Sequence, residues 1–201
     1  MSGQRRIVLA SNNPGKLREM RAILSHLQVE LLPQAHFGLT DAEETGTTFV
    51  ENAIIKARHA AAYSGLPAIA DDSGIEVDCL NGAPGIYSAR YAGEGAGDRA
   101  NLELLIKNAF ADDENKPPAR FQCLMVFMQH ASDATPIIAQ GTWEGYLVRE
   151  PRGEHGFGYD PVFYVPDHGC TSAELPPEVK NRISHRALAL LELAARLEDI
   201  L

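Results

Sequence analysis

Residues 6–16 read RIVLASNNPGK, and this stretch decides the fold. Its first five residues form an apolar run of strand length, and the polar loop Ser11–Lys16 follows. Apolar residues then recur at helical spacing as far as residue 27. The order of strand, loop and helix predicts an α/β protein that opens with a βα unit.

The rest of the chain continues this alternation. Thr48 and Glu51 have capping-box spacing, so we expect a helix that begins there and ends before Gly65. Further helices are expected at 98–110 and from residue 184 onward, and strands at 29–32, 120–129, 136–148 and 162–165. Residues 71–74 read as a turn or strand end between two short apolar runs, and 112–118 as a polar break. These elements predict an α/β fold with a mixed β-sheet and flanking helices, in a single domain over residues 1–201.

Composition narrows the functional class. The chain has 201 residues, of which 45 % are hydrophobic, and a formal net charge of −9. That charge argues against a nucleic-acid partner, whose phosphates attract clustered Lys and Arg, but a few local cations can still hold a small phosphorylated ligand. Three separated cysteines favour neither a zinc cage nor a disulfide framework. With no apolar run long enough to span a membrane or act as a signal peptide, we expect no membrane partner and a cytoplasmic protein.

The loop Ser11–Lys16 is the first candidate site. Asn13 suits a helix N-cap and Pro14 the first helical position, which places Lys16 in the first turn. A helix N-terminus beside a lysine ammonium is a suitable place for phosphate oxygens. The loop matches neither of the glycine-rich phosphate motifs, and an ordinary βα turn would use the same residues.

Two pairs of acids form the second candidate. Glu43 and Glu44 lie in one loop, and Asp71 and Asp72 in another. Magnesium prefers oxygen ligands, usually one or two carboxylates with phosphate and water, and a carboxylate can also accept a proton from an attacking water. Acidic turns on the solvated surface are the alternative. Lys56, expected on the helix that follows Thr48, would join the acids if it faced them, although a solvated lysine is more usual.

The third candidate is a segment suited to a purine base. Phe157, between two glycines, offers an aromatic face, and Asp160 offers a carboxylate. Lys180, His185 and Arg186 supply donors that would favour a base with a carbonyl at position 6 and leave adenine unpaired. A glycine-rich turn and a locally satisfied histidine are the alternatives.

Taken together, these segments closely resemble the bacterial inosine triphosphate/xanthosine triphosphate pyrophosphatases. The resemblance spans nearly the whole chain in order and rests on these segments: Ser11–Lys16, Ala42–Gly46 through Phe49–Ala53, Lys56–Arg58, Ala70–Gly74, Gly82–Arg90, Phe157–Pro161 and Ile183–Arg186. Ser11 stands where relatives often have Thr, which keeps the hydroxyl. The resemblance implies an elongated α/β fold with two lobes around a central cleft, and a homodimer.

The resemblance also implies a role for each site residue. The substrate would be a purine nucleoside triphosphate such as ITP, dITP, XTP or dXTP, and Mg²⁺ would be the cofactor. Glu43 and Asp72 would position the metal, Asp72 would also accept the proton of the attacking water, and Ser73 would contact substrate. The triphosphate would be held by Ser11, Asn12, Asn13, Pro14, Gly15, Lys16 and Lys56. The base would be enclosed by Phe157, Gly158, Tyr159, Asp160, Lys180, His185 and Arg186.

Two other functions remain open from the sequence. A pyrophosphatase for other modified nucleotides would use the same phosphate chemistry. A nucleotide sensor without turnover would bind the same ligands, although the presence of both Glu43 and Asp72 favours an enzyme.

Overall fold

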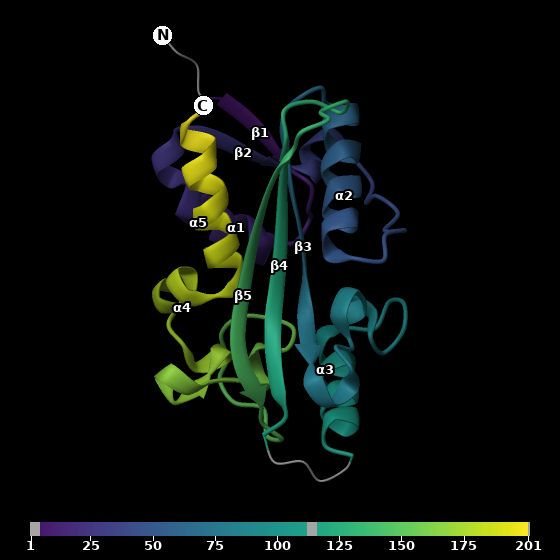
Figure 1. Cartoon of the computed structure of the whole chain (residues 1–201), viewed down its shortest axis with the longest axis vertical. Helices are drawn as coiled ribbons and strands as arrows, with labels where there is room; N and C mark the ends of the chain where they lie inside the picture. Colours follow the sequence, from purple (N-terminus) through teal and green to yellow (C-terminus); the bar gives the residue numbers. More distant parts are fainter. Residues whose placement is uncertain (1–4, 112–115, 201) are drawn as a thin grey trace. The chain divides into compact units, whose positions relative to one another are not determined.

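The computed structural model describes residues 5–111 and 116–200, and within them seven strands form one mixed sheet in the order β2-β1-β3-β4-β5-β6-β7 (Figure 1). The strands are β1 (Arg5–Leu9), β2 (Val29–Pro33), β3 (Ala68–Val77), β4 (Pro118–Met128), β5 (Ile137–Leu147), β6 (Phe163–Val165) and β7 (Cys170–Thr171). The helices are α1 (Pro14–Ile23), α2 (Phe49–Ser64), α3 (Asp98–Ala109), α4 (Pro177–Ile183) and α5 (His185–Glu198). β1 is parallel to β2 and β3, whereas β6 is antiparallel to β5 and β7. The predicted α/β class with a mixed sheet is confirmed.

The chain forms two compact units, and β3, β4 and β5 contribute residues to both. The first unit comprises the described residues of Met1–Asp72, Cys123–Gly141 and Arg186–Leu201. The second comprises those of Ser73–Gln122 and Thr142–His185. A single domain, two lobes and a central cleft stay predictions.

The first unit has helices on both faces of its strands. Successive strand side chains point to opposite faces, and β1 follows this rule. Ile7 and Leu9 pack in a core with α1 and α5, whereas Val8 packs with Ala57 and its neighbours on α2. Figure 1 shows α1 and α5 on one side of the strands and α2 on the other. Each central strand of this unit is therefore buried on both faces.

The order of the three parallel strands shows where a ligand would be expected to bind. The connection through α1 leads from β1 to β2 on one side, and the connection through α2 leads back past β1 to β3 on the other. In such sheets ligands bind beyond the carboxyl ends of the strands where the chain direction reverses. Leu9 pairs with Ile69, so the loop that begins at Ser11 lies level with Asp71 on β3.

The second unit has a core of its own. Apolar residues of α3 pack against the last part of β3, and the rings of Phe121 and Trp143 pack against Phe163 at tilted angles. None of the described helices is both long and apolar enough to cross a membrane.

The structure corrects the interpretation of residues 71–74. They form no turn, because β3 runs without a break from Ala68 to Val77. Asp71 and Asp72 are tolerated inside a buried strand because each is paired with a lysine. The short elements α4 and β7 were not predicted, and part of the predicted polar break, 112–115, lies outside the described residues.

Candidate active site

The loop after β1 has the predicted helix cap. Asn13 is the N-cap of α1, and its Oδ1 accepts hydrogen bonds from the backbone N–H groups of Gly15 at 2.8 Å and Lys16 at 3.2 Å. Pro14 occupies the first turn, as predicted. The Oγ of Ser11 accepts from the N–H of Asn13 at 3.1 Å. The cap therefore engages two of the N–H groups that the phosphate hypothesis invoked.

Asp71 points to the α1 and α5 side of the strand. Its Oδ2 lies 2.8 Å from the Nζ of Lys16 and 3.6 Å from the Nε of Arg186. The side chain of Arg186 is buried, with the residue only 2 % exposed. Its Nη1 lies 2.5 Å from Oε2 of Glu19. Although burial by itself would raise the pKa of Asp71, the three cations Lys16, Arg186 and Lys56 hold it well below its usual range. Asp71 is a buried, ionised link between the loop and α5.

Asp72, the next residue, points to the opposite side, toward α2. The Nζ of Lys56 lies 2.7 Å from its Oδ1 and 3.0 Å from Oε1 of Glu44. Burial raises the pKa of Asp72, and the ammonium of Lys56 offsets this only in part. Burial lowers the pKa of Lys56, but Asp72, Asp71 and Glu44 together raise it above its usual value. Lys56 is therefore charged and faces carboxylates, so the alternative of a solvated lysine does not hold.

The acidic loop, residues 40–47, places its two glutamates, Glu43 and Glu44, in different surroundings. Glu44 is partly buried and forms the ion pair with Lys56, whereas Glu43 is exposed. The loop is tied to the first strand–helix loop, because the Nδ2 of Asn12 donates to Asp41 at 3.2 Å, and Gln34 also donates to Asp41. The resemblance implied Glu43 for the metal, whereas Glu44, the other candidate acid of this loop, is the one that contacts Lys56.

The predicted base-binding segment lies in the second unit. The buried Asp160 accepts from the N–H of Phe157 at 2.9 Å, from the hydroxyl of Ser172 at 2.8 Å and from Lys180 at 2.6 Å. Lys180 also lies 5.4 Å from the centroid of the Phe157 ring. A Cβ on Gly156 would approach Oδ2 of Asp160 to 2.0 Å, so only glycine fits there. Asp160 thus organises the segment that carries Phe157.

Tyr159 and His185 are buried in the same unit. The hydroxyl of Tyr159 donates to the carbonyl of Ser88 at 2.7 Å, and burial raises its pKa above the usual range. The ring of His185 stacks on Phe121 with a centroid distance of 4.6 Å and an interplanar angle of 12°. Both side chains are therefore packed in the interior of the second unit.

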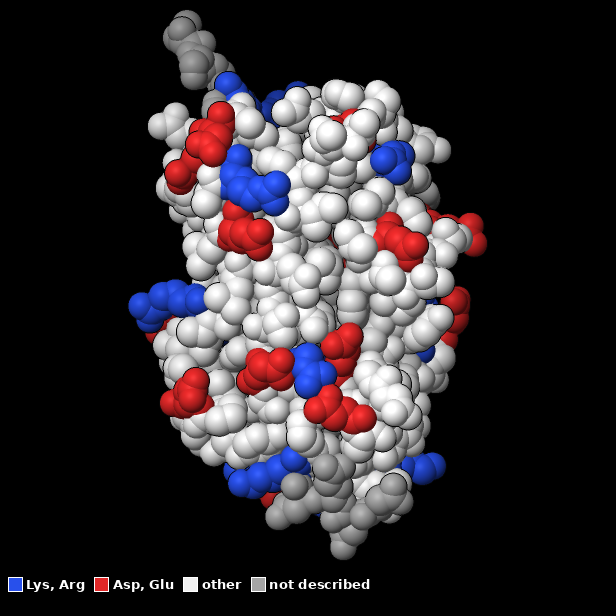
Figure 2. All heavy atoms as spheres, viewed as in Figure 1, with Lys and Arg blue, Asp and Glu red and all other residues white. Residues whose placement is uncertain are grey.

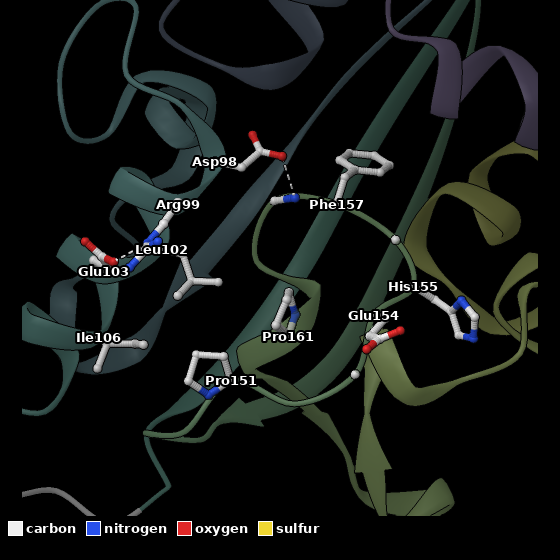
Figure 3. Close-up of a pocket in the computed structure, with 13 residues that line it drawn as sticks. Asp98, Arg99, Leu102, Glu103, Ile106, Pro151, Glu154, His155, Phe157 and Pro161 are labelled. Carbon is white, nitrogen blue, oxygen red and sulfur yellow. Dashed lines mark hydrogen bonds and ion pairs between the residues drawn. The ribbon is translucent and has the colours of Figure 1, made fainter.

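A pocket of about 680 Å³ opens beside this segment. Figure 3 shows Leu102 and Ile106 of α3 on one side of it and Pro151 and Pro161 on the other. Asp98 accepts from the N–H of Gly158 at 2.9 Å and so fixes the loop to α3. The pocket shares Phe157 and Gly158 with the predicted base-binding set.

The structure therefore collects the predicted residues into two sets. Lys16, Lys56 and Asp72 join in the first unit. Glu44 and Asp71, which were candidate acids without an assigned role, lie with them, and so does Glu19, which the sequence analysis did not name. Glu19 stands three positions after Lys16, a helical spacing that could have suggested a shared face. Phe157, Asp160 and Lys180 join in the second unit. Ser172, their partner, carried no signal in the sequence. Ser73 follows Asp72 on β3, at the first position of the second unit.

The match to a family model decides the family. The model of the Ham1 family matches residues 7–196. The chain belongs to the Ham1 family.

Individual Ham1 relatives match nearly the whole chain. A dITP/XTP pyrophosphatase from Vibrio parahaemolyticus is 56 % identical over 193 residues, which cover 96 % of each chain. One from Methylococcus capsulatus is 55 % identical over 197 residues, 98 % of each chain. The solved structure of a HAM1 protein from Coxiella burnetii is 51 % identical with a TM-score of 0.90, covering 97 % of this chain and 99 % of that one. This Ham1 structure shares the fold described here.

Proposed function

We propose that this chain hydrolyses deaminated purine nucleoside triphosphates, ITP, dITP, XTP and dXTP, to the monophosphate and pyrophosphate. The observation that carries the proposal is the pairing of Lys56 with Asp72 and Glu44 in a member of the Ham1 family. Relatives that are more than half identical to it are dITP/XTP pyrophosphatases. Removal of such nucleotides from the pool would be the cellular role.

The triphosphate end of the substrate is assigned to the first unit. Lys16 and Lys56 would exchange part of their present pairing with carboxylates for phosphate oxygens. The loop residues Ser11 to Gly15 would hold the same triphosphate. Asp72 would accept the proton of a water that attacks between the α- and β-phosphates, in line with the leaving pyrophosphate. Its raised pKa favours this role, because a more basic carboxylate accepts a proton more readily. Ser73, next on β3, would contact the substrate.

The same carboxylates suit Mg²⁺. The candidate oxygen ligands are those of Asp72, with Glu43 and Glu44 from the acidic loop. Among residues 5–111 and 116–200, no group of three or more His, Cys, Asp or Glu side chains is arranged to hold a metal ion. Mg²⁺ typically takes one or two carboxylates and completes its shell with phosphate and water. When bound, such a cation neutralises charge on the phosphates and on the leaving pyrophosphate.

The base is assigned to the second unit. Phe157 would offer an aromatic face to the base, and Gly158, Tyr159 and Asp160 would enclose it next to that ring. Lys180 and His185 would supply donors to a carbonyl at position 6 of the base. Arg186 stays in this set on the resemblance alone, since its guanidinium lies on Glu19 and Asp71.

A small phosphorylated substrate also agrees with the surface charge. On the face shown in Figure 2, basic and acidic residues are interspersed. A polyanion such as DNA or RNA would require a continuous basic surface. We propose further that the protein is a cytoplasmic homodimer with no nucleic-acid or membrane partner, and light scattering on the purified chain measures the oligomeric state.

Initial rates on a panel of triphosphates test the proposal. ITP, XTP, ATP, GTP and a methylated purine triphosphate are supplied at fixed Mg²⁺, and pyrophosphate and orthophosphate are separated. We expect pyrophosphate from ITP and XTP, at a kcat/KM at least about 100-fold above that for ATP. Preference for the methylated substrate would instead favour the pyrophosphatase for other modified nucleotides. Tight ITP binding without turnover would favour the nucleotide sensor, and orthophosphate as the product would contradict the proposed cleavage position.

A further inference from the structure

Asn52 is a fully buried amide on α2, one helical turn before Lys56. Its Oδ1 accepts from the N–H of Gly46 at 2.9 Å, and its Nδ2 donates to Oδ2 of Asp72 at 3.4 Å. Lys56 binds the other oxygen of Asp72. Both carboxylate oxygens of Asp72 are thus held by successive turns of the same helix.

Gly46 allows the acidic loop to approach α2 this closely. A Cβ at Gly46 would lie 2.7 Å from Oδ1 of Asn52 and 2.6 Å from the Cβ of Glu51. Two residues earlier, Glu44 reaches Lys56. The acidic loop is therefore fixed to α2 at two points, and Asp72 is fixed to the same two side chains of α2.

We propose that Asn52 is a positioning residue that sets the separation between the acidic loop and Asp72. The inference rests on the proposed function, in which these acids serve the divalent cation. An amide suits the place because it accepts from one neighbour and donates to the other without charge. Residues that orient metal ligands typically change metal affinity 10- to 100-fold when they are replaced.

A purely structural role for Asn52 needs a matched control. Asn101 is also a buried helical asparagine, 2 % exposed, and lies in the second unit. Its Oδ1 accepts from the N–H of Ala92 at 2.8 Å, and its Nδ2 donates to the carbonyl of Ala89 at 3.1 Å. N101A therefore removes a comparable pair of hydrogen bonds away from the acids.

The first measurement tests whether the hydrogen bond from the N–H of Gly46 to Asn52 exists in solution. Amide hydrogen exchange of Gly46 is measured in the wild type, N52A and N101A without metal or nucleotide. We expect exchange of the Gly46 amide to become at least about tenfold faster in N52A and to stay unchanged in N101A. Unchanged exchange in N52A would overturn the proposal, whether or not the protein proves to be a pyrophosphatase.

The second measurement tests whether this contact affects binding of the divalent cation. Mn²⁺ binding is followed by electron paramagnetic resonance, with a non-hydrolysable ITP analogue at saturation, and the Mg²⁺ activation constant is measured separately from the KM for ITP. We expect N52A and G46A each to weaken Mn²⁺ binding and Mg²⁺ activation about tenfold or more, with KM for ITP at saturating Mg²⁺ changed less than twofold. N52A and G46A both disrupt the same contact between Asn52 and Gly46. The double variant should therefore bind Mn²⁺ no more weakly than the weaker-binding of the two single variants. Wild-type Mn²⁺ affinity in N52A, or an equal loss in N101A, would overturn the positioning role. Absence of ITP turnover in the wild type would instead count against the proposed function.

Discussion

At the residue scale, Asp71 and Asp72 are chain neighbours with opposite electrostatic environments. Lys16 and Arg186 flank Asp71 and keep it ionised, whereas burial raises the pKa of Asp72 despite Lys56. The alternation of a strand separates them, since one carboxylate faces α1 and α5 and the other faces α2. The first therefore has a structural role, and the second is the more basic group.

Replacement of Asp71 should destabilise the protein strongly. In D71N, Lys16 and Arg186 lose a buried counter-charge, and we expect the free energy of unfolding to fall by about 3–5 kcal/mol. D72N is the matched control. A charge that burial disfavours is removed there, and Lys56 keeps Glu44. Denaturant unfolding of the three proteins measures the difference, and equal losses in D71N and D72N would contradict the assignment.

Two glycines of the base segment offer a second test at this scale. Gly156 and Gly158 both have positive φ, +80° and +60°, but only Gly156 lacks room for a Cβ, which would strike Asp160. We expect G156A to lower kcat/KM for ITP about 100-fold, because displacement of Asp160 moves the segment that carries Phe157. G158A should cost only the backbone strain, about 1–2 kcal/mol of stability. Similar kinetics in both variants would show that the contact with Asp160 does not matter.

At the scale of elements, the helix α2 was predicted from its ends and β3 was not predicted as one strand. Thr48, Glu51 and Gly65 act locally, so their spacing sufficed. Asp71 to Gly74 look like a turn because local preference is all that a sequence shows. Lys16 and Lys56, distant along the chain, neutralise the aspartates and allow the strand to continue. Tertiary pairing decided this element.

The capping box of α2 gives a prediction for that element. T48A removes the hydroxyl that accepts from the N–H of Glu51 at 3.3 Å, and the unfolding free energy should fall by about 1 kcal/mol. Thr45, an exposed residue just before the cap, provides the control variant T45A. Thermal or denaturant unfolding compares the two. Equal unfolding free energies of T48A and T45A would show that the cap does not stabilise the protein.

At the scale of the whole molecule, stability should fall with acidification. The pKa of Asp71 lies below its value in the unfolded chain, and so do those of Glu51, Asp133 and Glu174. As the pH falls, the unfolded chain takes up these protons first, so the stabilisation is present above about pH 4 to 5 and is lost below it. Asp72, with its raised pKa, acts in the opposite direction but is a single group. Hydrogen bonds from backbone N–H groups lower the pKa values of Glu51, Asp133 and Glu174, and ion pairs lower that of Asp71. Unfolding free energies measured from pH 7 to pH 3 should decline, and a rise over that range would contradict these contacts.

The sequence allowed prediction of the fold class and of most helices and strands. It also indicated which kinds of residue, lysines, carboxylates and an aromatic side chain, would make up the candidate site. Periodicity and caps are local signals, and a resemblance over the whole chain supplied the roles. The partners of each side chain could not be predicted. Glu44 rather than Glu43 meets Lys56, and Arg186 meets Glu19, because side-chain direction depends on packing that no spacing specifies.

The central claim is that Asp72 and its partners in the first unit carry out pyrophosphate release from ITP. The most direct measurement is turnover of ITP by the wild type and D72N at saturating Mg²⁺, with pyrophosphate quantified and folding verified by circular dichroism. We expect pyrophosphate formation by the wild type and a kcat lower by about 10²- to 10⁴-fold in folded D72N. Near-wild-type turnover by folded D72N would contradict it.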